Sequence, residues 1–333
     1  MPGLFTTYYQ LSNKIKGLPL DISWRLGLNR SWVKKTTGSR ILLYHGICLK
    51  DPFRFNTLFI TRHSFEEQLR LYKKHFNLIS LEDHYQQRFS KDRFNICLTF
   101  DDGFANNYNH VLPLLEKYRV PAAFFITGIR EAGYDILWND LLGIAGKYGP
   151  GKFRLGNEEF KKQRDGKYRS PGGVSLNSML RVTGFDQKAE MIKLLEPMLS
   201  FRQKKTDDHW LQLDPRQIRE LAGSKWVTIG SHGYYHNDLA HLLPGKAREE
   251  MIRSKEYLEK ITGKKINALA FPYGSYTPEV LSIAKSCGFD QLLATEFLFP
   301  ADHHDATMRE RLTINPFISN INQLHANLRG HYK

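Results

Sequence analysis

A short apolar run that ends in two adjacent acids constrains the fold more than any other stretch of this chain. Residues 96–103 read ICLTFDDG, and an apolar run of this length without a helical period is typical of a strand buried on both faces. Asp101 and Asp102 then lie at the carboxyl end of that strand, where Gly103 permits a sharp turn. Because buried acids are costly without a positive partner, we expect a cation or a basic side chain beside them.

Two histidines far downstream are candidate partners of this acidic pair. They are His232 and His236, in residues 231–236, which read SHGYYH. Side chains four apart can share one face of a helical turn, and two imidazoles with one carboxylate form a three-ligand metal set with open positions. Taken alone, the histidines are as well explained by structural roles. For the acids the alternative is a solvated turn at a strand end.

Strand and helix signals alternate along most of the chain. The predicted strands are residues 40–47, 96–103, 121–127, 226–231, 268–273, 289–295 and 311–317. The main predicted helices are residues 64–76, 106–118, 214–222, 247–261 and 278–286. A strand, a helix and a second strand in this order imply a parallel pair with a crossover helix. About seven such strands predict an α/β fold, closed as a parallel (β/α) barrel.

This alternation breaks between about residues 128 and 214. The stretch holds an apolar helical patch that opens at Leu137-Trp138-Asn139-Asp140 and a second predicted helix over residues 187–199. We interpret it as a long insertion on one barrel loop, and long loops at the active face of a barrel usually shape a substrate groove.

Part of the positive excess of this chain, whose net charge is +14, lies at the front. Residues 1–40 hold seven Lys or Arg against Asp21 alone, with apolar and aromatic residues interleaved. This mixture suits an interfacial segment on an anionic membrane surface. The alternative is a basic extension packed on the barrel with part of its charge solvated. We therefore divide the chain into a basic amphipathic segment, residues 1–39, and a barrel domain, residues 40–333.

Several partners and compartments are disfavoured by the sequence. No apolar run approaches the ~20 residues of a membrane span, and the start lacks the apolar core of a secretory signal. The three cysteines are widely spaced and odd in number, as in reduced cytosolic proteins. We expect a cytoplasmic protein, peripheral at the inner membrane. The basic charge comes with no recognised nucleic-acid-binding motif, so no nucleic-acid partner is expected.

Three motifs in one order resemble the polysaccharide deacetylase family, also called the NodB-homology family or carbohydrate esterase family 4. They are TFDDG at residues 99–103, SHGYYH at residues 231–236 and FPYG at residues 271–274, the last similar to the branch with FAYPYG. The resemblance implies a distorted (β/α)7 barrel. It also implies a metal-dependent hydrolase that removes an acyl group, typically N-acetyl, from an amino sugar of a surface polysaccharide or a lipid-linked saccharide.

The resemblance also implies a role for each matching residue. Asp102, His232 and His236 would bind a divalent metal, Zn²⁺ first, with Co, Ni or Mn as alternatives. Such an ion acidifies its bound water and polarises the substrate carbonyl. Asp101 would act as the general base, and the backbone N–H of Tyr273 would stabilise the oxyanion.

The chain departs from the family pattern in two places. The arginine that usually precedes the PY element is absent, because residues 268–271 read ALAF, and the late histidine that serves as general acid is not recognisable. We expect Arg311, at the start of the last predicted strand, to supply the missing positive charge. For the proton donor the first choice is His45, at the end of the first predicted strand, followed by His303 and His304.

Two other functions compete with the hydrolase. The missing arginine and histidine are also expected of a catalytically impaired homologue that only binds glycans. Two histidines and one carboxylate also bind Fe(II) in non-haem oxygenases, although those usually fold as sandwiches of strands. Within the insertion, Trp138 and Trp210 either stack on sugar rings or form the core that the insertion needs.

Overall fold

The computed structural model describes residues 4–332, and within the first helix it describes the side chains of Ser12 and of Ile15 onward. The strands of the main sheet are β1 (Ser39–Tyr44), β4 (Asn77–Ile79), β5 (Asn95–Phe100), β6 (Ala122–Ile126), β10 (Val227–Ser231), β11 (Ala268–Ala270), β12 (Gln291–Ala294), β13 (Met308–Glu310) and β14 (Leu312–Thr313). The helices outside the insertion are α1 (Leu4–Arg25), α2 (Arg30–Lys35), α3 (Arg62–His75), α4 (Leu81–Tyr85), α5 (Leu112–Tyr118), α9 (Pro215–Gly223), α10 (Pro244–Thr262), α11 (Pro278–Ser286) and α12 (Asn320–Arg329).

The main sheet closes on itself as a ring of parallel strands. Its order is β13-β12-β11-β10-β6-β5-β1-β14. β13 and β14 are the two halves of one segment, residues 308–313, which is interrupted at Arg311. The first half pairs with β12 and the second half with β1, both in parallel. The ring therefore has seven positions, which confirms the predicted (β/α)7 barrel. The last strand begins earlier than predicted, at Met308, and ends at Thr313.

Even-numbered and odd-numbered side chains of β5 face two different hydrophobic clusters. Ile96, Leu98 and Phe100 pack into the large cluster under the surrounding helices. Cys97 belongs to a smaller cluster built from β1, β6, β11 and β12 as well, and residues from so many strands of one ring can meet only inside it. Asp101 follows with the same parity as Cys97, so β5 directs it into the mouth of the barrel.

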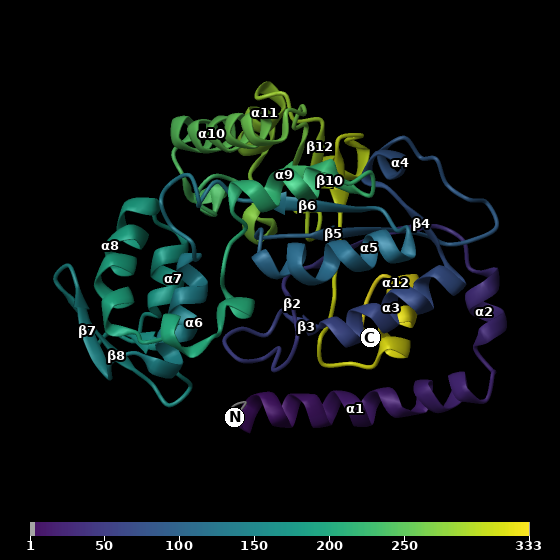
Figure 1. Ribbon diagram of the computed structural model, residues 1–333, viewed down its shortest axis with the longest axis horizontal. Coiled ribbons are helices and arrows are strands. Elements are labelled where there is room, and N and C mark those ends of the chain that lie inside the picture. Colours follow the sequence, from purple (N-terminus) through teal and green to yellow (C-terminus); the bar gives the residue numbers. More distant parts are fainter. Residues whose placement is uncertain (1–3, 333) are drawn as a thin grey trace.

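Most of the residues between β6 and α9 form a lobe beside the barrel (Figure 1). The lobe contains α6 (Trp138–Tyr148), α7 (Leu176–Arg181), α8 (Phe185–Leu195) and the antiparallel strands β7 (Lys152–Leu155), β8 (Glu158–Lys162) and β9 (Tyr168–Arg169). It has a hydrophobic cluster of its own, in which Trp138 and Trp210 are each only 2% exposed. Both tryptophans are therefore core residues, and the sugar-stacking alternative was wrong for them.

The basic segment at the front packs along the side of the barrel (Figure 1). α1 lies against α12, where Asn322 Nδ2 donates to the carbonyl of Gly17 at 3.1 Å. The ring of Trp24 contacts the ring of His325, and Val33 of α2 joins the large hydrophobic cluster. Among the described residues, no helix combines the length and the hydropathy that crossing a membrane requires.

Candidate metal centre

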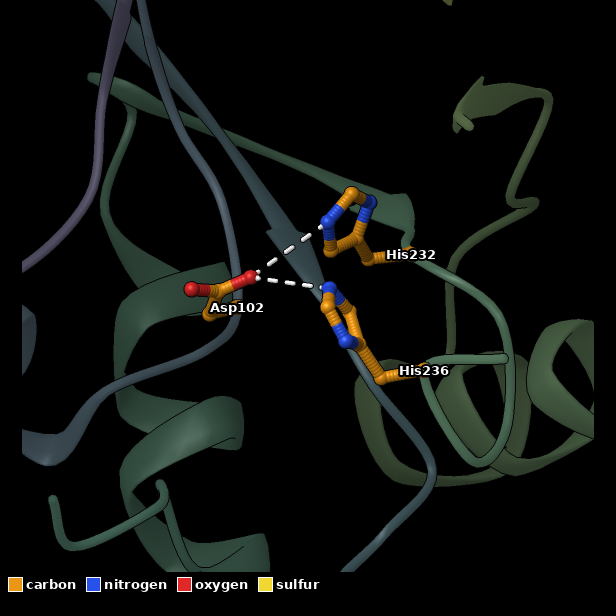
Figure 2. A group of neighbouring side chains, drawn as sticks. All are labelled: Asp102, His232 and His236. Atoms are coloured by element: carbon orange, nitrogen blue, oxygen red, sulfur yellow. Dashed lines mark ion pairs between the residues drawn. The ribbon is translucent and has the colours of Figure 1, made fainter. Parts of the chain in front are cut away.

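The carboxyl ends of β5 and β10 bring Asp102, His232 and His236 together (Figure 2). Asp102 Oδ1 lies 3.4 Å from Nε2 of His232 and 3.2 Å from Nε2 of His236. The three candidate ligand atoms all lie within 4.8 Å of one another, and all three residues are buried. Within residues 4–332 no other group of three histidine, cysteine or acidic side chains has this geometry. The structure thus assembles the ligand set that the motifs singled out.

Three of the site residues have a left-handed backbone. Asp102 has φ +75° immediately after β5, His236 has φ +57° and Tyr273 has φ +61°. Non-glycine residues in this region cost about 1–3 kcal/mol each and cluster at functional sites. The turn at Asp102 explains how adjacent acids can both face the site, although side chains of a regular strand alternate.

The loop that carries the two histidines is not the helical turn expected from their spacing. Residues 232–236 have no helical hydrogen-bonding pattern. Glu250 of α10 is the cause, because its Oε1 accepts the N–H groups of Tyr235 (3.0 Å) and Asn237 (3.2 Å), and its Oε2 accepts Nδ2 of Asn237 (2.9 Å). The amides of the loop are thus bonded to a buried carboxylate from a distant helix instead of to helix carbonyls.

The hydrogen bonds and charges around His232 fit a cation. Its Nδ1 lies 2.8 Å from the carbonyl of Ala270, so Nδ1 carries the proton and the lone pair of Nε2 faces Asp102. Burial tends to lower the pKa of His232, but Asp101 and Asp102 outweigh it and raise the pKa. Burial tends to raise the pKa of Asp102, but its interactions with His232 and His236 bring it well below its usual value. Lone pairs that face one another in a buried site need a positive charge between them, and a divalent metal fits that place.

Arg311 forms a bidentate ion pair with Asp101, beside the candidate metal ligands Asp102, His232 and His236. Its Nη1 and Nη2 donate to the two carboxylate oxygens at 2.7 Å each, and Nη1 also reaches Thr99 Oγ1 at 3.3 Å. Burial tends to raise the pKa of Asp101, but Arg311 and then His232 outweigh it and lower the pKa. Asp101 Oδ2 lies 3.7 Å from His232 Nε2. The cation expected near the acidic pair is therefore present, at the break between β13 and β14.

The three candidate proton donors lie at opposite ends of the barrel. His45 directly follows β1 and is close enough to Asp101 and Asp102 for their charges to act on it. Burial nevertheless lowers the pKa of His45. His303 and His304 line a cavity of about 360 Å³ together with Ser39, the first residue of β1. That cavity is at the amino ends of the strands, so the structure does not bring His303 or His304 to the site.

Asp140 is a site residue that the sequence reasoning did not single out. It lies in the first turn of α6, is 3% exposed, and accepts one long bond of 3.4 Å from Asn56 Nδ2. Its Oδ2 is buried without a hydrogen-bond partner among the described residues. Burial, with the charge of Asp102 second, raises the pKa of Asp140 well above its usual value. The sequence did offer one signal for Asp140, since it is an acid inside the apolar patch at residues 137–144.

The lobe is tied to the histidine loop by two cations. Arg181 Nε donates to Asp238 Oδ2 at 2.8 Å, and its guanidinium lies 4.8 Å from the ring centre of Tyr273. Lys188 of α8 is buried and donates to Asn237 Oδ1. The side chain of Tyr273 also packs against the core of the lobe. The lobe therefore forms one wall of the site, and Asp101 and Arg311 belong to the barrel wall.

Comparisons with solved structures show where this fold recurs. The deacetylase PplD of Streptococcus pyogenes, solved in complex with acetate, superposes with a TM-score of 0.58 at 20% identity, covering 88% of this chain and 99% of its own. IcaB from Ammonifex degensii superposes with a TM-score of 0.53 at 20% identity, covering 89% of this chain and 98% of its own. At this identity the likeness is one of fold.

Sequence comparisons identify the family. The model of the polysaccharide deacetylase family matches residues 90–154 and 196–292, and the unmatched residues between the two ranges belong to the lobe. YxkH of Bacillus subtilis is 20% identical over 277 residues, which are 80% of this chain and 68% of that protein. Members of this family are hydrolases of carbon–nitrogen bonds other than peptide bonds. The chain belongs to the polysaccharide deacetylase family, and its place in the FAYPYG-like branch stays a prediction.

Proposed function

We propose that this protein removes an acyl group, typically N-acetyl, from an amino sugar of a surface polysaccharide or of a lipid-linked glycan precursor. The observation that carries the proposal is the buried Asp102–His232–His236 group with the ion-paired Asp101 beside it. A divalent metal held by those three side chains, with Zn²⁺ as first choice, would supply the Lewis acidity that amide hydrolysis requires at neutral pH.

The remaining residues then have separate tasks. Arg311 keeps Asp101 ionised, so Asp101 can accept the proton of the attacking water. Arg311 itself acts through Asp101 and is a positioning residue. The backbone N–H of Tyr273 lies in the 3-10 turn η6 (Pro272–Gly274), after β11, and is our proposed donor to the oxyanion.

Two buried groups compete for the role of proton donor to the leaving amine. His45, the choice from the sequence, is near both acids, but its lowered pKa favours the neutral imidazole at pH 7. Asp140 has a raised pKa and a free carboxyl oxygen, so it holds a proton that it can give. We therefore place Asp140 first and keep His45 as the alternative.

The test is release of free acetate. Protein loaded with Zn²⁺ is incubated with a panel of acetylated amino sugars and lipid-linked saccharides, with chelator-treated protein as the control. We expect acetate from at least one substrate and none after chelation. Metal binding without acetate release on the whole panel would instead favour the glycan-binding alternative, and oxygen consumption with Fe(II) would favour the oxygenase.

A further inference from the structure

One side of α1 presents an apolar stripe to solvent. The stripe consists of Ile15 (63% exposed), Leu18 (54%), Ile22 (47%) and Leu26 (70%), the last just after the end of the helix. Spacings of three and four residues place these side chains on one side of a helix. A row of this kind on one element is more than the scattered apolar residues found on any protein surface.

The opposite side of α1 is fixed to the barrel. Gly17 and Asp21 both bond to Asn322 of α12, and Trp24 lies edge-on to His325 of the same helix, with ring centres 5.9 Å apart. Because these contacts hold the helix in one rotation, the apolar stripe cannot turn inward. The fold therefore keeps this face exposed.

The exposed charged side chains of residues 15–35 are all positive. Lys16 and Arg25 lie on its two flanks, and Arg30, Lys34 and Lys35 of α2 are exposed as well. The single acid among residues 1–40 is Asp21, which accepts bonds from Ser319 Oγ at 2.6 Å and from Asn322 Nδ2 at 3.0 Å on the packed side. The one compensating charge is thus turned away from the exposed face.

We propose that the exposed face of α1 and α2, residues 15–35, docks on an anionic phospholipid bilayer. The apolar stripe enters the boundary between headgroups and acyl chains, and the flanking cations meet the anionic headgroups. Charge complementarity favours this partner over a second copy of the chain, whose matching face would bring like charges together. The proposal does not depend on the metal centre.

Vesicle co-sedimentation of the full chain tests the proposal. Vesicles of phosphatidylcholine with about one third phosphatidylglycerol are compared with pure phosphatidylcholine vesicles. The test variant is I15S/L18S/I22S/L26S. The matched control is V174S/V182S/L243S, which removes exposed apolar side chains of the lobe and of the loop before α10. We expect the anionic vesicles to bind the native chain about tenfold more strongly than the neutral ones, and less at high salt. The test variant should lose at least about tenfold in binding, whereas the control should keep it.

Three outcomes would overturn the proposal. The first is a native chain that stays in the supernatant with anionic vesicles. The second is a test variant that sediments like the native chain. The third is a dimer, seen by sedimentation equilibrium, that the same substitutions dissociate. Circular dichroism and a thermal melt check that both variants are folded. Acetate release from a soluble substrate tests the metal centre separately, so a failure of the membrane proposal can be told apart from a failure of the proposed function.

Discussion

The two walls of the site differ in how completely their buried carboxylates are bonded. On the barrel wall both carboxylate oxygens of Asp101 accept bonds from Arg311. On the lobe wall, Oδ2 of Asp140 is buried without a hydrogen-bond partner among the described residues. The same is true of Nδ1 of His236 and of the hydroxyl of Tyr273, whose side chain packs against the lobe. Buried polar atoms without partners are rare in folded proteins, and each one calls for an explanation.

The difference indicates a division of labour. The barrel wall pairs its carboxylate with a guanidinium, as expected of an acid that must stay ionised before the substrate arrives. The lobe wall leaves donors and acceptors that a polar substrate can bond, which compensates for their burial. We infer that the barrel wall prepares the nucleophile and that the lobe wall receives the sugar and its leaving amine.

Loss of a candidate metal ligand should have the largest effect. Asn tolerates the left-handed backbone at position 102, so D102N keeps the fold while removing the charge. Turnover should fall by at least about 10³-fold, more than the about 10–100-fold that loss of an outer-shell partner costs. Metal content by mass spectrometry should fall in parallel. H303Q, at the other end of the barrel, is the control and should match the native enzyme. Full activity in D102N would contradict the ligand assignment.

Substitution of Asp140 should have the next largest effect. D140N keeps the shape and can donate a hydrogen bond, but it cannot transfer a proton. If Asp140 is the proton donor, D140N and D140A should both lose about 10²-fold in kcat, the lower range for proton transfer by a side chain. Metal content should not change. A D140N variant as active as the native enzyme, beside an impaired H45Q variant, would move the role to His45.

Removal of Arg311 should affect stability more than chemistry. R311M leaves the Asp101 carboxylate buried and unpaired, which should cost about 3–5 kcal/mol in the free energy of unfolding. Arg311 lowers the pKa of Asp101, so its loss should move the acid limb of the pH–activity profile to higher pH. Urea unfolding and turnover between pH 4 and 9 measure both effects.

A double variant provides the control for this prediction. D101L/R311M removes both charges, so it should recover much of the stability lost in R311M while staying inactive. If the double variant is as unstable as R311M, the ion pair is not the reason for the loss.

The smallest expected effect concerns the tie between the lobe and the histidine loop. Burial lowers the pKa of Lys188 to about 8, below the value of about 10.4 in an unfolded chain. Between these pH values the unfolded state binds more protons, so the contribution of Lys188 to the free energy of unfolding rises with pH. K188M should lack this rise in urea midpoints measured from pH 7 to 10.5. Equal slopes for the two proteins would contradict a buried Lys188.

The sequence predicted the barrel and the ligand group because their signals are local. The run before Asp101 is short and apolar, and each motif follows its own strand. The predicted helical turn at His232 and His236 was wrong because Glu250, from a later helix, determines the conformation of this loop. Asp140 was missed because only the folding of the lobe brings it near Asp102. His303 and His304 were candidate proton donors because of their residue type alone. The register of β12 and β13 places them at the amino ends of the strands, away from the site.

The segment that closes the ring also carries the guanidinium of the site. A nascent chain that has been synthesised only to residue 300 lacks both the last strand of the barrel and the counter-ion of Asp101. Until that point the acid is unpaired and the mouth of the barrel is open at one side. Closure of the barrel and the pairing of Asp101 therefore depend on the same late segment of the chain.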